Sequence, residues 1–196
     1  MSFTEKPGSG TPNWEDPIEQ GYIHVPNGDF EEGSGDLPDD WEGVGGECEC
    51  AVWNTDDPVS GLKCLELGRP SVGDATYAYQ NATLITIPSA GTHTLLLSYR
   101  GAVQSYFEVW LSETPWVAPE DNDGTRVVNQ AGAGEWTNIE HEITTTGNLY
   151  IILKGKTISA GSAAGPKVDC IRIRTTARDF DGVAGSATTF TEVTNP

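Results

Sequence analysis

The sequence has few basic residues, with 11 Lys and Arg against 29 Asp and Glu, and its formal net charge is −18 at pH 7. Residues 15 to 57 hold fourteen acidic residues and no Lys or Arg. An acidic field of this size repels nucleic-acid phosphates and anionic membranes and attracts cations. The composition therefore predicts no nucleic-acid partner and no membrane partner. It leaves two interpretations open, a solvated acidic surface and a cation-linked function.

Long apolar runs, helical periodicity and an export signal are also missing. No stretch approaches the length of a membrane-spanning helix, and the first residues lack a cationic segment followed by an apolar one. We therefore expect either use without export or removal of a signal. The four cysteines, Cys48, Cys50, Cys64 and Cys170, form no C-x-x-C pair, so a zinc site is not expected. Reduced thiols are the default, and a Cys50–Cys64 bridge stays open if the chain is exported.

The sequence lacks the motifs that carry catalysis. It has no G-x-S-x-G elbow, no H-E-x-x-H pair and no phosphate-binding loop, and its three histidines are scattered. Adjacent acids such as Asp39 and Asp40 lie in turn-rich sequence, whereas a glycosidase pair needs carboxylates facing each other across a cleft. We assign no catalytic residue and predict a protein that is not an enzyme.

What the sequence has is a series of short segments typical of β-strands, separated by Gly- and Pro-rich turns. The expected strands are 48–53, 62–68, 75–80, 83–87, 92–100, 104–111, 125–129, 135–143, 148–154 and 167–175. Apolar residues alternate within them, as at 107, 109 and 111 and at 149, 151 and 153. This spacing predicts an all-β fold, a two-sheet antiparallel β-sandwich of the jelly-roll type.

The two ends of the chain read as extended arms around one domain. We expect an N-terminal arm over 1–21, the jelly-roll domain over 22–178 and a C-terminal arm over 179–196. Trp14, Ile18 and Phe190 are isolated apolar residues in these arms and are predicted to dock onto a partner. The two ends echo each other in the tripeptides 3–5 and 190–192, both Phe-Thr-Glu, each followed by a Pro. Such segments resemble the short repeats around domains in structural proteins of tailed phages.

Two motifs about 140 residues apart carry a second resemblance. The first is Asn27-Gly28-Asp29-Phe30-Glu31, followed by Leu37-Pro38 and Trp41, and the second is Lys167-Val168-Asp169-Cys170-Ile171-Arg172-Ile173. In this order they resemble the first and last motifs of carbohydrate-binding modules and galactose-binding-like jelly-roll domains. The resemblance implies that residues 25–32 supply a strand, a packed Phe and oxygens near a metal ion.

Asp169 is the main candidate for a metal ligand. It shares its strand parity with Ile171 and Ile173, so a regular strand would point its carboxylate inward, and a buried carboxylate needs compensation. The resemblance implies a structural calcium held by Asp169, by Asp29 or Glu31, and by backbone carbonyls of residues 60–63. The alternative is that Asp169 caps a turn or pairs with a base such as Lys63.

The polar side of 104–111 is the candidate sugar-binding face. It would present Gln104, Tyr106, Glu108 and Trp110, and Tyr77 and Tyr79 share a face on another expected strand. Aromatic rings can stack on the apolar face of a pyranose, while amides and carboxylates bind its hydroxyls. The alternative is that loops, the arms or a neighbouring subunit cover these rings.

Two functions follow from these patterns. The first is a virion structural protein, a capsid decoration protein or tail-associated protein of a bacteriophage. It would bind capsid or tail proteins at the virion surface, as a homo-oligomer or in a multi-copy assembly. It rests on the arms and on the absence of a signal. The alternative is a carbohydrate-binding module of a secreted polysaccharide-degrading enzyme, with glycans as partners. It rests on the two motifs and on the Tyr/Trp face.

Overall fold

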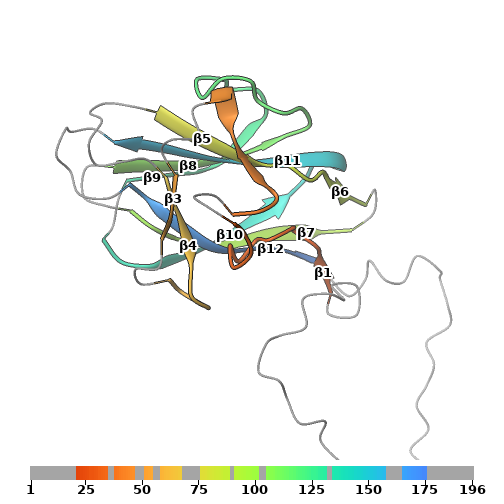
Figure 1. Cartoon of the computed structure of the whole chain (residues 1–196). Helices are drawn as coiled ribbons and strands as arrows, with labels where there is room; N and C mark the ends of the chain where they lie inside the picture. Colours follow the sequence, from red (N-terminus) through yellow and green to blue (C-terminus); the bar gives the residue numbers. More distant parts are fainter. Residues whose placement is uncertain are drawn as a thin grey trace, which may run out of the picture.

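In the described part of the chain, regular secondary structure is almost wholly β-strand, and the strands form two facing layers, as the computed structural model shows (Figure 1). The structure describes residues 21–34, 38–46, 51–54, 58–67, 76–88, 91–101, 105–131, 134–157 and 165–175. The predicted arm residues Trp14, Ile18 and Phe190 lie outside these ranges. Within them, no helix is long and apolar enough to cross a membrane.

Each layer is a six-stranded antiparallel sheet. The first sheet has the order β10-β7-β12-β4-β3, with β1 also paired to β12, and the second has the order β2-β5-β11-β8-β9, with β6 also paired to β11. The bounds of the first sheet are β1 Tyr22–Ile23, β3 Ala51–Asn54, β4 Cys64–Leu67, β7 His93–Arg100, β10 Thr137–Ile143 and β12 Lys167–Thr175. Those of the second are β2 Trp41–Gly43, β5 Thr76–Asn81, β6 Ile85–Ile87, β8 Ser105–Ser112, β9 Thr125–Ala131 and β11 Gly147–Thr157. The short 3-10 helix η1, Val44–Gly46, follows β2.

This architecture confirms the predicted antiparallel β-sandwich and its jelly-roll class. All ten expected strands are present, displaced by at most a few residues at their ends, and β1 and β2 are additional. Strand alternation explains the success, because residues that face the core recur at every second position. Phe107, Val109 and Leu111 on β8 all lie in the core between the sheets, as expected, and so do residues 149, 151 and 153 on β11.

The segment Val25–Glu32 is a turn and not the strand that the family resemblance implied. Asn27 and Phe30 have positive φ angles of 43° and 56°, which a strand cannot accommodate. The Asn27 side chain holds the turn: its Nδ2 donates to the carbonyls of Glu32 and Asp39, and its Oδ1 accepts the Glu32 N–H. The packed Phe was predicted correctly, since Phe30 is fully buried, 5.2 Å from the ring of Trp41.

The two sequence motifs touch in the folded chain. The N–H of Ile171, on the last strand, donates to the carbonyl of Gly28 over 2.7 Å. A Cβ on Gly28 would overlap the backbone oxygen of Ile171, so the turn approaches the strand at a distance that only glycine permits. Val25 and Phe30 pack in the same core as Ile171. The first motif therefore closes the sandwich against the last strand.

Of the cysteines in the described ranges, Cys64 is buried and Cys170 is half-buried, and no disulfide joins these two. Cys48 and Cys50 lie outside the described residues, so the Cys50–Cys64 bridge that the sequence left open stays untested.

Candidate functional site

The outer face of the second sheet, which points away from the core, carries the candidate site. Because neighbouring residues of a strand point to opposite faces, burying Phe107, Val109 and Leu111 turns Tyr106 and Trp110 outward. Tyr106 is 44% exposed, whereas Trp110 is only 9% exposed. Of the two outward rings on β8, Tyr106 is therefore the one available for stacking.

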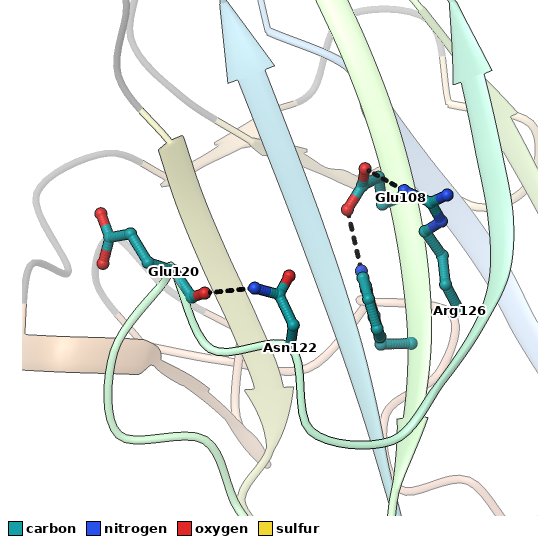
Figure 2. Close-up of polar contacts among 5 residues, drawn as sticks. Glu108, Glu120, Asn122 and Arg126 are labelled. Carbon is teal, nitrogen blue, oxygen red and sulfur yellow. Dashed lines mark hydrogen bonds and ion pairs between the residues drawn. The ribbon is translucent and has the colours of Figure 1, made fainter.

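Glu108 lies between these two rings in sequence and orders the polar groups of the face. Its Oε2 accepts the indole N–H of Trp110 over 2.8 Å, and its Oε1 accepts an N–H of Arg126 over 3.2 Å (Figure 2). Arg126 comes from β9, which pairs with β8 and places Arg126 opposite Trp110. The guanidinium also lies 5.7 Å from the Trp110 ring centroid, within cation–π range. A carboxylate and a guanidinium are thus held in fixed positions on an accessible face.

Lys154 adds a second cation to the same face. Its ammonium lies 5.9 Å from the ring centroid of Trp110 and 5.3 Å from that of Trp116. Lys154 is on β11, directly opposite Glu108 in the register of the sheet. The Lys154 ammonium therefore lies over the indoles of both Trp110 and Trp116, so a ligand cannot stack on both rings.

The loop 113–124, between β8 and β9, covers Trp110. Trp116 from this loop lies against Trp110, and the loop is tied to the sheet by Gln80 on β5. The Gln80 Oε1 accepts the backbone N–H of Trp116 over 2.9 Å, and its Nε2 donates to Glu42 Oε1 over 2.9 Å. The Trp116 indole N–H donates to the carbonyl of Asp123. The alternative considered for this face, that a loop covers its rings, holds for Trp110 and not for Tyr106.

A tight turn shapes the far part of this loop. One oxygen of Asp121 accepts the backbone N–H groups of Val117 and Ala118 over 2.8 and 2.9 Å. These two hydrogen bonds, from Ala118 and then Val117, lower the pKa of Asp121, with a smaller contribution from Lys154. The Asn122 side chain donates to the carbonyl of Glu120 in the next turn (Figure 2). The loop that covers Trp110 is therefore ordered by its own polar side chains.

Two predicted sugar-binding residues lie elsewhere. Tyr77 and Tyr79 are buried in the core between the sheets, 5% and 1% exposed, so their placement on the sugar-binding face was wrong. The reason is the parity of β5, whose outward side is occupied by Ala78 and Gln80. Gln104 lies outside the described residues. Tyr106, Glu108 and Trp110 do share the outer face.

Sequence reasoning did not find Arg126, Lys154 or the covering role of Trp116. The pairing of β8 with both β9 and β11 brings the two cations to Glu108 and Trp110. Strand alternation could have put Lys154 on an outward face, but it does not say which strands are neighbours. Only the order of the sheet supplies that information.

A second polar cluster joins the predicted metal ligands to the segment 58–63. Asp169 is fully buried, and its Oδ2 accepts the backbone N–H groups of Val59 and Ser60 over 2.9 and 3.1 Å. Glu31 Oε1 accepts those of Leu62 and Lys63 over 2.7 and 2.9 Å. Glu31 and Asp169 thus both accept hydrogen bonds from this segment, whereas Asp29 accepts none from it in the described part of the chain.

Asp169 is buried as expected, but for a different reason. Val168 pairs with Tyr99, and both are core residues, whereas Asp169 pairs with Ser98 on the opposite face. A β-bulge follows, in which Cys170 and Ile171 oppose a single residue of β7 and Cys170 has a φ of 57°. The bulge reverses the parity that linked Asp169 to Ile171. Asp169 is covered by the segment 58–60 and does not belong to the apolar core.

The donor set at Asp169 does not fit a calcium ion in this arrangement. The expected ligands from 60–63 were backbone carbonyl oxygens, but the groups that point at the carboxylates are N–H groups. Calcium requires oxygen ligands. In the described ranges, no three His, Cys, Asp or Glu side chains gather as a metal site would need. Calcium binding stays a prediction, and turn capping by Asp169 is the alternative that agrees with these contacts.

Burial shifts the pKa of two neighbouring groups, the Asp169 carboxyl and the Cys170 thiol. Burial raises the pKa of Asp169, and the N–H donors of Ser60, Cys170 and Val59 act in the opposite direction. Burial also raises the pKa of the neighbouring Cys170 thiol, to about 11, and its sulfur lies 2.9 Å from the Ser60 hydroxyl oxygen.

Comparison with solved structures shows what this fold is similar to. The carbohydrate-binding module TmCBM61, solved with β-1,4-galactotriose, matches with a TM-score of 0.56 at 14% identity, over 79% of this chain and 99% of the module. The K3 adhesin domain of Lys-gingipain from Porphyromonas gingivalis matches with a TM-score of 0.53 at 15% identity, over 78% of this chain and 96% of the domain.

A third neighbour is the C-terminal family 22 carbohydrate-binding module of Xyn10B from Clostridium thermocellum. Its TM-score is 0.50 at 15% identity, over 82% of this chain and 97% of the module. No family model matches the sequence, and no curated protein matches it. At these identities the likeness shows the fold, which is a jelly roll of the kind found in carbohydrate-binding modules.

Proposed function

We propose that this chain is a non-catalytic glycan-binding domain that binds sugar on the outer face of its second sheet. The observation that carries the proposal is the row of Tyr106, Glu108 and Arg126, an exposed ring beside a fixed carboxylate and a fixed guanidinium. The similarity to TmCBM61, a module solved with β-1,4-galactotriose, supports the same function. The module TmCBM61 and the family 22 module also favour this function over a virion role.

The chemistry of the face suits a neutral sugar. The ring of Tyr106 offers a surface on which the C–H face of a pyranose stacks. Each carboxylate oxygen of Glu108 has two lone pairs and uses one, for Trp110 or for Arg126, so each can accept one hydroxyl. Arg126 uses one of its five N–H groups on Glu108 and can donate others to sugar oxygens. Trp110 positions Glu108 and does not itself stack on the ligand.

Affinity electrophoresis tests this proposal, with β-1,4-galactan as the first probe and a panel of neutral polysaccharides after it. Retention of the wild type on at least one glycan is expected, together with an up to about tenfold weaker retention of Tyr106→Ala, since aromatic stacking contributes about 0.5–1.5 kcal/mol. Tyr106→Phe should keep the stacking surface and most of the retention. Leu84→Ala is the matched control, because Leu84 is 43% exposed and precedes β6, which pairs with residues 147–149 of β11, whereas Tyr106 pairs with Lys156 at the other end of that strand.

Either of two results would contradict the proposal. One is that the wild type moves freely through every glycan of the panel. The other is that Tyr106→Ala, with an unchanged far-UV spectrum, is retained as strongly as Leu84→Ala. Attachment to phage particles through residues 1–21 stays a prediction of its own, because it rests on arm residues outside the described ranges.

A further inference from the structure

The segment Pro58–Lys63 carries four backbone N–H groups that converge on two carboxylates. Val59 and Ser60 donate to Asp169, and Leu62 and Lys63 donate to Glu31. Gly61, with a φ of 65°, separates the two pairs. Successive N–H groups in such a turn form a concave site with a positive potential, which binds anions. We call this segment the amide cradle.

The amide cradle is oriented by these contacts and not by burial of its side chains. Leu62 is 72% exposed and Val59 is 42% exposed, although both are apolar. A segment that leaves these side chains in water while its N–H groups point inward is held by the hydrogen bonds of its backbone. The negative charge of the carboxylate acceptors makes these hydrogen bonds stronger than those to neutral acceptors.

The shape of the cradle is matched to a carboxylate. A Cβ on Gly61 would overlap the Glu31 carboxylate, so the turn is built directly around that group. On the other side, the bulge turns the Cys170 N–H toward Asp169 Oδ1, over 2.7 Å. Both oxygens of the fully buried Asp169 are therefore hydrogen-bonded to backbone donors. The desolvated carboxylate has the compensation that a cation would otherwise have to supply.

A cation and the amide cradle exclude each other. A calcium ion at about 2.3–2.6 Å from the carboxylates would face the positive ends of four N–H dipoles. We infer that the amide cradle of residues 58–63 takes the carboxylates of Glu31 and Asp169 in place of a metal ion, so that the sandwich closes without calcium. This closure is independent of whether the outer face of the second sheet binds sugar.

Calorimetry and metal analysis of the full chain test the inference. The wild type, purified without chelator, should contain far less than one calcium per chain by atomic emission. Its Tm should be the same in EDTA and in calcium chloride. Asp169→Asn should lower the Tm by several degrees in both buffers, because an amide NH₂ then faces backbone N–H groups. Glu31→Gln tests the second pair of donors, the N–H groups of Leu62 and Lys63. Glu31 is only half-buried, so this variant perturbs the buried interior less than Asp169→Asn.

The matched control is Glu140→Gln, since Glu140 is an exposed carboxylate on β10 and lies outside the cradle. A wild-type Tm that falls in EDTA, recovers with calcium and loses this response in Asp169→Asn or Glu31→Gln would overturn the inference. A calcium response that persists in both variants would place the cation elsewhere on the acidic surface, and it would contradict closure without calcium. If Asp169→Asn does not fold, the metal content of the wild type and the response of Glu31→Gln decide.

Discussion

The indole of Trp116 lies against the indole of Trp110, with ring centroids 5.4 Å apart and planes tilted by 59°. Trp110 belongs to β8 and Trp116 to the loop that follows it, so the chain folds a loop back over its own strand. The pair leaves Trp110 with 9% of its surface exposed and Tyr106, on the same strand, with 44%. The loop thereby selects which aromatic ring of the face meets solvent.

The bond between this loop and the sheet can be tested at Gln80. Gln80→Leu keeps the approximate volume but leaves the buried N–H of Trp116 without its acceptor. An unsatisfied buried group costs about 1–3 kcal/mol, so we expect a loss of this size in the free energy of unfolding. Urea denaturation measures the loss, and stronger acrylamide quenching of tryptophan fluorescence should accompany it. Asn122→Ala removes an exposed hydrogen bond within the same loop and serves as the control. Equal stability of the two variants would contradict the role of Gln80.

Asn27 should be essential to the N-terminal turn for two separable reasons. Its side chain makes three hydrogen bonds, and its backbone has a φ of 43°. Asn27→Gly removes the hydrogen bonds, for a loss of about 1–4 kcal/mol, while tolerating the positive φ. Asn27→Ala should cost about 1–2 kcal/mol more, because a Cβ disfavours this conformation. Guanidinium denaturation of both variants gives the comparison, and an Asn27→Ala variant as stable as Asn27→Gly would show that φ contributes nothing.

Asp121 predicts a pH dependence of the covering loop. The pKa of Asp121 is lowered in the folded protein from its ordinary value of 3.8. A lowered pKa means that the folded state favours the ionised carboxylate, so the stabilisation is complete above pH 3.8 and is lost as the pH falls through the lower, folded-state pKa. We expect Asp121→Asn to be less stable than the wild type at pH 6, with the difference shrinking progressively below pH 3.8. Denaturation curves across this range measure it. A stability difference that grows with acidity would have the wrong sign.

Although Cys170 is partly exposed, we expect its thiol to react slowly. Burial raises the pKa of its thiol to about 11, so little thiolate exists at neutral pH, and the thiolate is the nucleophile. In a chain carrying Cys48→Ser and Cys50→Ser, labelling with a disulfide reagent at pH 8 should be much slower than that of free cysteine. The rate should rise as the pH approaches 11, within the range where the chain stays folded. Rapid labelling at pH 7 in the native state would contradict the raised pKa.

The fold followed from the sequence because its signals are local. Turn residues separate the strands, and the period of two places Phe107 and Ile151 in the core without any knowledge of the partners of β8 and β11. The period of two alone cannot reveal a β-bulge. This is why Asp169 was assigned to the face of Ile171 and Ile173, although its burial was predicted correctly. The period of two also cannot assign an aromatic residue to the inner or the outer face of a sheet when both faces carry aromatic rings, as the misplaced Tyr77 and Tyr79 demonstrate.

The sequence by itself therefore determined the sandwich and the outward row of Tyr106, Glu108 and Trp110. Only the tertiary structure decided which strands lie beside β8, and hence that Arg126 and Lys154 reach this row. It also decided that loop 113–124 covers Trp110 and that backbone N–H groups, not carbonyl oxygens, meet Asp169. The physical reason is the same in each case. Strand order and the direction of a peptide group depend on contacts between residues far apart in the chain, and these leave no periodic trace in the sequence.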